Sequence, residues 1–178
     1  MKLLEISDTE IVTMDDYPIH DLREGVSDGV ILKLYFRIFQ TGCEKIIARV
    51  SLLPKNLVMG SFDEKIKQKF EEFEKNNPQV KFFALDGQHR STAASLAKSK
   101  IPAILLQSDD DCKELQRLND TPEVFRHYRN NTLAECVAEL KNHFINVEKF
   151  YTAEEKTKRM VDDMTVNMPQ YMRDSFNR

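Results

Sequence analysis

The stretch "VKFFALDGQHRSTAASLAKSKIPAILL", residues 80–106, decides the fold predicted for this chain. Residues 80–85 form a short apolar run typical of a buried strand, and "IPAILL" at 101–106 indicates another. Between them an Asp-Gly turn leads into a segment rich in small residues, 89–99, which favours a helix. The order strand, tight turn, helix, strand predicts an α/β fold.

The segments before this stretch extend the predicted sheet. "VILKLYFRIF" (30–39) alternates apolar residues and is rich in β-branched and aromatic types, which predicts a strand. A turn at Gly42 would pair it with a second strand in "KIIARVSLL" (45–53) as a hairpin.

The other segments are predicted to be helical. Ser61 and Glu64 have the spacing of a capping box, which predicts a helix over 62–75. From Ser108 onward the pattern is helical, with expected helix starts at Asp109, Thr121, Thr132 and Thr152. Two apolar stripes should face the core there: Leu133, Val137, Leu140 and Phe144, and a weaker one of Met160, Met164 and Met168.

Length and composition indicate one globular domain with a helical appendage. The chain has 178 residues, 41% hydrophobic and 31% charged, with a net charge of -3. The sequence has no basic arm of the kind that indicates a nucleic-acid partner. The three cysteines, Cys43, Cys112 and Cys136, lack zinc-site spacing and indicate reduced thiols. No run of apolar residues is long enough to span a membrane, so we expect a cytoplasmic protein without a membrane partner.

The loop after the strand at 80–85 has the features of an anion site. Gly87 can adopt a positive φ and lets a ligand approach the backbone. The helix that follows offers unpaired N–H groups and, in Ser91 and Thr92, two hydroxyls. His89 and Arg90 are potential cations at the positive end of a helix dipole, an arrangement that makes sense if an anion binds there. Asp86 can cap the turn, bind a divalent metal or accept a proton.

This motif resembles that of the ParB/sulfiredoxin superfamily, in which a strand, a short loop and a helix hold a nucleotide phosphate. The pentapeptide Asp-Gly-Gln-His-Arg is similar to that of the DGQHR-domain proteins, among them DndB-like proteins associated with DNA modification. The likeness covers about residues 80–106, and a weaker one extends back to 62–75. It implies a ParB/sulfiredoxin-like small mixed sheet in residues 1–108, followed by a helical extension in 109–178.

The resemblance assigns roles within the loop. Gly87, His89 and Arg90 match phosphate-binding positions, and Asp86 matches a position that serves metal or acid–base chemistry in kinase members. Gln88 stands where sulfiredoxins have their catalytic cysteine, so sulfiredoxin chemistry is not expected. The nucleotide phosphate would then lie among six residues: Gly87, Gln88, His89, Arg90, Ser91 and Thr92. Asp86 would hold Mg²⁺, and Asp86 and His89 would be the catalytic pair if the protein is an enzyme.

The function implied is that of a nucleotide-binding protein, using ATP or CTP with Mg²⁺, in DNA maintenance, modification or its regulation. Whether it hydrolyses the nucleotide or transfers a phosphoryl group is open. One alternative is a non-catalytic DNA-binding regulator, whose loop grips a backbone phosphate and whose helical extension forms a homodimer. Another is a small-molecule kinase of the ParB-like serine-kinase type, with Glu24 as a further carboxylate. A protein-interaction module with a vestigial loop is the third.

Three other groups of residues have both a functional and a simpler structural interpretation. The first is an acidic run that could bind a cation but is typical of a helix start. The second is a basic and aromatic cluster that could contact phosphate or a base but also fits a polar helix face. The third is a set of carboxylates that could reach a nucleotide but is also common in solvated turns. The acidic run is Asp109, Asp110 and Asp111. The basic and aromatic cluster is Arg126, His127, Tyr128 and Arg129. The carboxylates are Asp21, Glu24 and Asp28.

Overall fold

The strand predicted at 80–85 lies inside a mixed sheet. The computed structural model of the protein describes residues 2–14, 27–41, 49–118 and 132–178. Within them, five strands form one sheet in the order β1-β5-β3-β4-β2. Their bounds are β1 (Lys2–Ile6), β2 (Ile11–Val12), β3 (Val50–Pro54), β4 (Phe82–Ala84) and β5 (Ile101–Leu105).

The central strand β3 gives the sheet its mixed character. It runs parallel to β5 and antiparallel to β4. At the two edges, β1 pairs antiparallel with β5, and β2 pairs parallel with β4. The predicted α/β class and mixed sheet are therefore confirmed, as are the strands predicted at 80–85 and 101–106.

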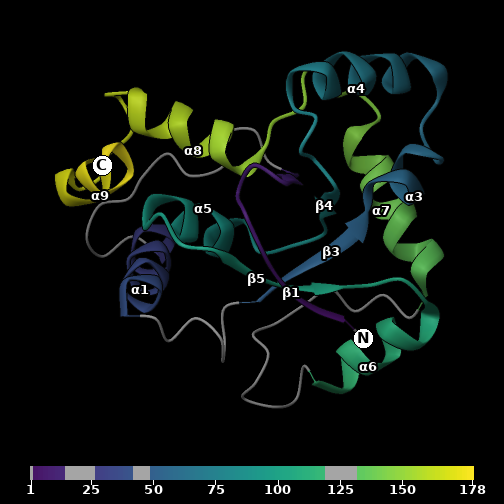
Figure 1. Ribbon diagram of the computed structural model, residues 1–178, viewed down its shortest axis with the longest axis horizontal. Helices are drawn as coiled ribbons and strands as arrows, with labels where there is room; N and C mark the ends of the chain where they lie inside the picture. Colours follow the sequence, from purple (N-terminus) through teal and green to yellow (C-terminus); the bar gives the residue numbers. More distant parts are fainter. Residues whose placement is uncertain (1, 15–26, 42–48, 119–131) are drawn as a thin grey trace.

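Helices cover both faces of this sheet (Figure 1). One layer contains α1 (Ser27–Thr41), α5 (Gln88–Leu96), α8 (Ala153–Asp162) and α9 (Gln170–Asn177). The other contains α3 (Lys55–Met59), α4 (Glu64–Asn76), α6 (Asp109–Leu118) and α7 (Leu133–Phe144). Each layer packs an apolar side against the sheet, and together they close two cores.

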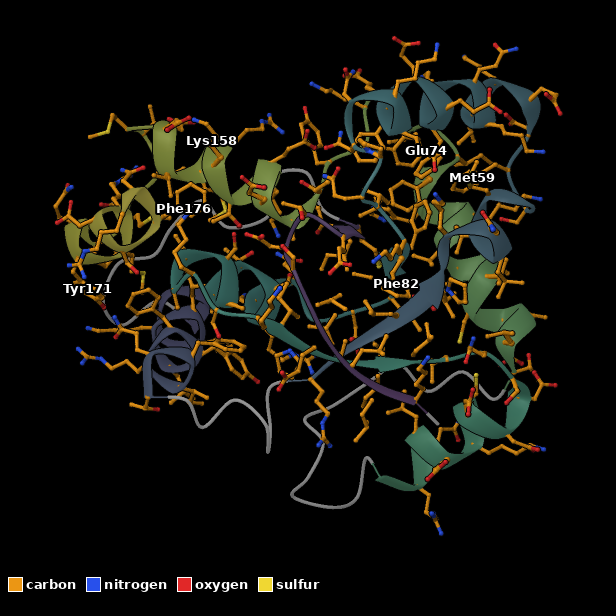
Figure 2. All side chains as sticks on the ribbon, in the orientation of Figure 1. Met59, Glu74, Phe82, Lys158, Tyr171 and Phe176 are labelled. Atoms are coloured by element: carbon orange, nitrogen blue, oxygen red, sulfur yellow. The ribbon has the colours of Figure 1, made fainter. Side chains whose placement is uncertain are left out.

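The second core, between the sheet and the layer of α3, α4, α6 and α7, is aromatic. Six phenylalanine rings meet there with centroids 5.0–6.2 Å apart, a spacing that favours edge-on and tilted pairs. They are Phe62, Phe70, Phe73, Phe83, Phe144 and Phe150. Glu74 of α4, which Figure 2 labels, forms an ion pair with Lys55 of α3.

Both cores contain residues from before and after position 109. The first combines α1, α5 and the sheet with α8 and α9, and the second combines α3, α4 and the sheet with α6 and α7. The predicted boundary between residues 1–108 and 109–178 stays a prediction, but the two segments share their apolar interior.

The prediction of a strand at 30–39 is wrong, because these residues belong to α1. Their buried side chains are Leu32, Tyr35, Phe36 and Phe39, at the i, i+3, i+4, i+7 spacing of a helix. Leu34, which the alternating pattern placed inside, is 54% exposed. The predicted hairpin partner survives only as β3, and the turn at Gly42 lies outside the described residues. Because apolar residues occupy adjacent positions in this segment, the sequence fits both the two-residue repeat of a strand and the 3.6-residue repeat of a helix. Packing against α5 and the sheet selected the helix.

Helix starts were predicted with mixed success. The helix over 62–75 is α4, but its N-cap is Asp63, whose carboxylate accepts from Ile66 N at 2.9 Å, and not Ser61. The capping boxes of Thr132 and Thr152 are confirmed, each with its glutamate three residues later. The expected start at Thr121 lies outside the described residues.

The two predicted apolar stripes differ in outcome. Leu140 and Phe144 are buried, and Leu133 and Val137 are partly buried against the aromatic core, as expected. In the methionine stripe Met160 and Met168 are buried, but Met164 is 77% exposed because α8 ends at Asp162.

No helix in the described part of the chain is long and apolar enough to cross a membrane.

Candidate functional site

The Asp-Gly-Gln-His-Arg loop lies at the carboxyl end of β4, beside the start of β3. The antiparallel pairing of these strands places residues 85 and 86 next to Ser51. Leu85 N donates to Ser51 O at 2.8 Å, and Ser51 N donates to Asp86 Oδ1 at 2.9 Å. The loop is therefore anchored to the sheet by backbone and side chain at once.

Gly87 makes the turn from strand to helix. Its φ of +84° lies in the left-handed region, which favours glycine. A Cβ at this position would lie 2.8 Å from Val50 Cγ2, too close for any other residue without a shift. The helix α5 follows at once, and Ser91 N donates to Gly87 O at 2.8 Å. Within the described residues no side chain caps this helix start.

Arg90 points back into the protein. Its side chain is buried; it donates to Arg49 O and lies 3.7 Å from Asp86 Oδ1. Asp86 thus holds both the backbone of β3 and the guanidinium of Arg90. The capping interpretation of Asp86 stays a prediction, because the hydrogen bond that its carboxylate accepts comes from Ser51 in β3 and not from the turn or from α5. Its roles in metal binding and proton transfer stay predictions.

A cavity of about 800 Å³ opens beside the loop. One side is polar and consists of Asp86, Gly87, Gln88, His89, Arg90 and Ser91. A largely apolar part of the lining comes from other elements: Met14 after β2, and Ile31, Leu34 and Tyr35 of α1. Thr13, Ala84 and His143 complete the lining. The volume falls in the range of small-molecule sites.

Tyr35 connects the two sides. Burial raises the pKa of its phenol; the positive charge of Arg90 opposes this shift and the negative charge of Asp86 adds to it. The phenol therefore stays protonated at neutral pH, so its hydroxyl can both donate and accept a hydrogen bond.

A second, smaller hollow adjoins the cavity. It has a volume of about 410 Å³ and shares Thr13, Met14 and His143 with the first. His143 of α7 contacts the carbonyl oxygen of Met14 through Nε2 and lies at the junction. The two hollows together provide room for a ligand larger than the loop alone would hold.

The structure brings most of the predicted loop residues to one cavity, with one exception. Thr92 is 1% exposed and does not belong to the cavity lining. Its Oγ1 has no hydrogen-bond partner among the described residues. Ser91 lines the cavity, although its hydroxyl donates to Gln88 O at 3.2 Å. A phosphate contact from Thr92 stays a prediction, but its burial gives it no support.

The wall opposite the loop was not predicted. Met14, Ile31, Leu34, Tyr35 and His143 were not identified as site residues from sequence. Interpreting 30–39 as a helix would have placed Ile31, Leu34 and Tyr35 on adjacent turns, which is the signal that could have found them. For Met14 and His143 no local signal exists, because only the fold brings them to α5.

These observations define the site by its geometry. No family model, curated protein or solved structure matches this chain. The likeness to the ParB/sulfiredoxin superfamily therefore stays a prediction based on the loop.

The other predicted groups give little additional chemistry. Asp111 accepts from Gln107 N at 2.8 Å and from Ser108 N at 3.1 Å, and Asp109 accepts from Leu133 N at 2.8 Å. The acidic run thus serves helix starts. Among the described residues no group of three or more His, Cys, Asp or Glu could hold a metal. Asp21, Glu24 and the cluster at 126–129 lie outside the described residues, and Asp28 lies in the first turn of α1.

Proposed function

We propose that the cavity beside residues 86–91 binds a nucleotide, with a phosphate at the start of α5 and the nucleoside against α1. The observation that carries this proposal is the two-sided lining of the cavity, polar on the loop and apolar on the facing helix. A ligand that fits both sides has an anionic end joined to a flat, largely apolar body.

The polar side suits the anionic end. The first backbone N–H groups of an α-helix have no intrahelical acceptor, and the helix dipole adds positive potential there. Gly87 begins α5 without a side-chain cap among the described residues, and the imidazole of His89 and the guanidinium of Arg90 line the cavity beside it. Asp86 and Arg49 O hold Arg90 in place, and His89, the preceding residue, also belongs to the cavity lining, so we propose His89 as the first side chain to test for contact with a phosphate.

The apolar side suits the body of the ligand. Ile31 is 39% and Leu34 54% exposed, although both are large apolar residues. Exposed apolar side chains that line a cavity are covered when a ligand binds, and about 25 cal/mol is gained for each Å² removed from water. The neighbouring Tyr35 adds an aromatic side chain to the same part of the lining.

The residues of this site could hold Mg²⁺ only together with phosphate oxygens of a bound nucleotide. Mg²⁺ in nucleotide sites is held by one or two carboxylates together with phosphate oxygens and water. Asp86 supplies a carboxylate in the cavity lining, but its Oδ1 already accepts from Ser51 N. Asp86 would hold the ion beside the phosphates, where Mg²⁺ would neutralise their charge.

The first test is a titration of the protein with ATP, ADP, CTP, GTP and their monophosphates, each with Mg²⁺ and with EDTA. Binding is measured by calorimetry and by the shift in melting temperature. A ligand at about a hundred times its Kd adds roughly 2.7 kcal/mol of apparent stability. No binding of any nucleotide would overturn the proposal.

Two variants locate the phosphate. His89→Ala removes an imidazole hydrogen-bonding group from the loop and should weaken binding about tenfold, in proportion to one hydrogen bond. Lys158→Ala is the control, because Lys158 is exposed on α8 (Figure 2) and does not belong to the cavity lining, so its loss tests whether any surface cation affects binding. Equal weakening in both variants would indicate nonspecific attraction.

A third variant separates the nucleoside from the phosphates. Leu34→Ala should weaken nucleotide binding several-fold because apolar contact is lost. The same variant should bind inorganic tripolyphosphate as the unmodified protein does. An equal loss for both ligands would place the nucleoside elsewhere.

The link to DNA is supported only by the resemblance of the loop, so DNA is the second ligand to test. Affinity for a duplex that falls steeply with salt, without nucleotide binding, would favour the non-catalytic regulator. Release of inorganic phosphate that is lost in Asp86→Asn, with nucleotide binding retained, would favour an enzyme.

A further inference from the structure

Two cysteines far apart in the sequence meet in the interior of the protein. Cys112 lies on α6 and Cys136 on α7, 24 residues apart, and their Sγ atoms are 3.9 Å from one another. Both side chains are buried, at 2% and 1% exposure, in the aromatic core. Nothing in their spacing indicates this contact, and the cavity beside α5 does not include them.

The helices that hold the two thiols are fixed to each other nearby. Leu133 N, in the first turn of α7, donates to Asp109 Oδ1 in the first turn of α6 at 2.8 Å. This pair is also 24 residues apart, so both contacts follow the same register between the helices. The capping box at Thr132 fixes the start of α7 independently. The thiols therefore face each other across an anchored helix pair.

The distance is close to that needed for a covalent bond. Sulfur atoms in a disulfide are about 2.05 Å apart, so the two Sγ atoms must approach by roughly 1.9 Å. Rotation about χ1 and small shifts of the two helices can supply this movement, because the pair already points inward from adjacent helices.

We propose that Cys112 and Cys136 form a reversible disulfide when the protein meets a hydroperoxide. One thiolate attacks a peroxide oxygen, which forms a sulfenic acid and releases hydroxide in the case of hydrogen peroxide. The second thiol attacks the sulfenic sulfur and expels its oxygen as water. Overall, two thiols and one hydrogen peroxide give one disulfide and two waters, and a dithiol reductant reverses the change.

Burial of the two thiols restricts the reaction to small oxidants. The raised pKa of the Cys112 thiol makes the reaction slow. Burial raises the pKa of the Cys112 thiol; the contact with Cys136 opposes this shift, and the carboxylates of Asp109, Asp111 and Glu135 raise the pKa further. Little thiolate is present at neutral pH. A bulky disulfide, an alkylating reagent or a dithiol reductant reaches the pair only when the core opens, so reduction of the bond is slow as well.

The bond would tie α7 to α6. His143, at the far end of α7, lines the candidate site, so the tether connects the aromatic core to one wall of the cavity. The proposal itself does not depend on what the cavity binds.

The test uses the full chain carrying Cys43→Ser, so that the third cysteine cannot exchange. The protein is incubated with hydrogen peroxide for hours, remaining thiols are alkylated under denaturing conditions, and peptides are identified by mass spectrometry. We expect a cross-linked peptide containing Cys112 and Cys136 that disappears after dithiothreitol. The melting temperature should rise by several degrees on oxidation and return on reduction, because the bond restricts the unfolded chain.

The variants Cys112→Ala and Cys136→Ala serve as matched controls. Neither should form the cross-link or show the rise in melting temperature. If either variant fails to fold, the peptide analysis of the Cys43→Ser protein alone decides. Full alkylation of both thiols after oxidation would overturn the proposal, as would sulfinic acid on one cysteine without a cross-link.

Discussion

Gly87 is the residue on which the candidate site depends most directly. Its positive φ turns the chain from β4 into α5, and the missing Cβ lets the turn pack on Val50. Glycine is required at this position for two separate reasons: the backbone has a positive φ, and Val50 leaves no space for a Cβ atom. Both serve the same end, which is to open the start of α5 toward the cavity.

We therefore expect Gly87→Ala to be strongly destabilising. The left-handed conformation costs an L-residue about 1–2 kcal/mol, and the contact with Val50 adds to this cost. The free energy of unfolding from urea titration, followed by circular dichroism, should fall by at least about 2 kcal/mol.

Gly60→Ala is the matched control for this variant. Gly60 has a φ of -61°, and an added Cβ would be 3.4 Å from its nearest neighbour, an ordinary contact. Alanine there should change the stability by less than about 1 kcal/mol in either direction. A similar loss in both variants would show that the special role given to Gly87 is wrong.

At the scale of elements, local chemistry fixed where several helices begin. Thr132 and Thr152 start α7 and α8 with capping boxes, and their glutamates return a hydrogen bond to the cap. For α4 the same pattern at Ser61 gave the wrong cap, because Asp63 is also a good N-cap and lies closer to the first apolar residue, Ile66. The capping-box spacing marks Ser61 because Glu64 follows it, but it overlooks Asp63, which caps α4 without a glutamate three residues later.

The start of α4 can be tested with substitutions at Asp63. Asp63→Ala should lower the free energy of unfolding by about 1 kcal/mol, and Asp63→Asn should restore most of it because asparagine also caps helices. Hydrogen exchange of the Ile66 amide should quicken in the alanine variant, since that amide loses its acceptor. Ser61→Ala should leave this exchange rate unchanged, and a faster rate there would return the cap to Ser61.

The whole molecule is held together by two cores that its early and late segments share. Phe150, between α7 and α8, packs its ring against Phe70, Phe73 and Phe144 with centroids 5.0–6.0 Å apart. It is 1% exposed. A residue far along the chain thus completes the core beneath β4 and α4.

Phe150→Ala should therefore destabilise the entire protein, by about 3–5 kcal/mol. Ile145→Ala is the control, because Ile145 is 53% exposed and its truncation should cost little. Urea unfolding should proceed in one transition when followed both by circular dichroism and by tyrosine fluorescence. Separate unfolding of the helices after residue 109 would show that they form an independent extension.

The local features of this protein could be predicted from neighbouring residues. The sequence predicted the strand, turn, helix and strand of 80–106, the glycine at the turn and two capped helices, because each depends on neighbouring residues alone. It failed at 30–39, where apolar residues at adjacent positions fit both a strand and a helix.

Only the tertiary structure decided which distant residues meet. It selected the helix at α1, placed Ile31 and Leu34 in the same cavity lining as His89, buried Arg90 against Asp86 and brought Cys112 to Cys136. The physical reason is that these contacts arise from burying two helical layers on one sheet. That choice is made by the apolar surface of the whole chain, and no local pattern contains it.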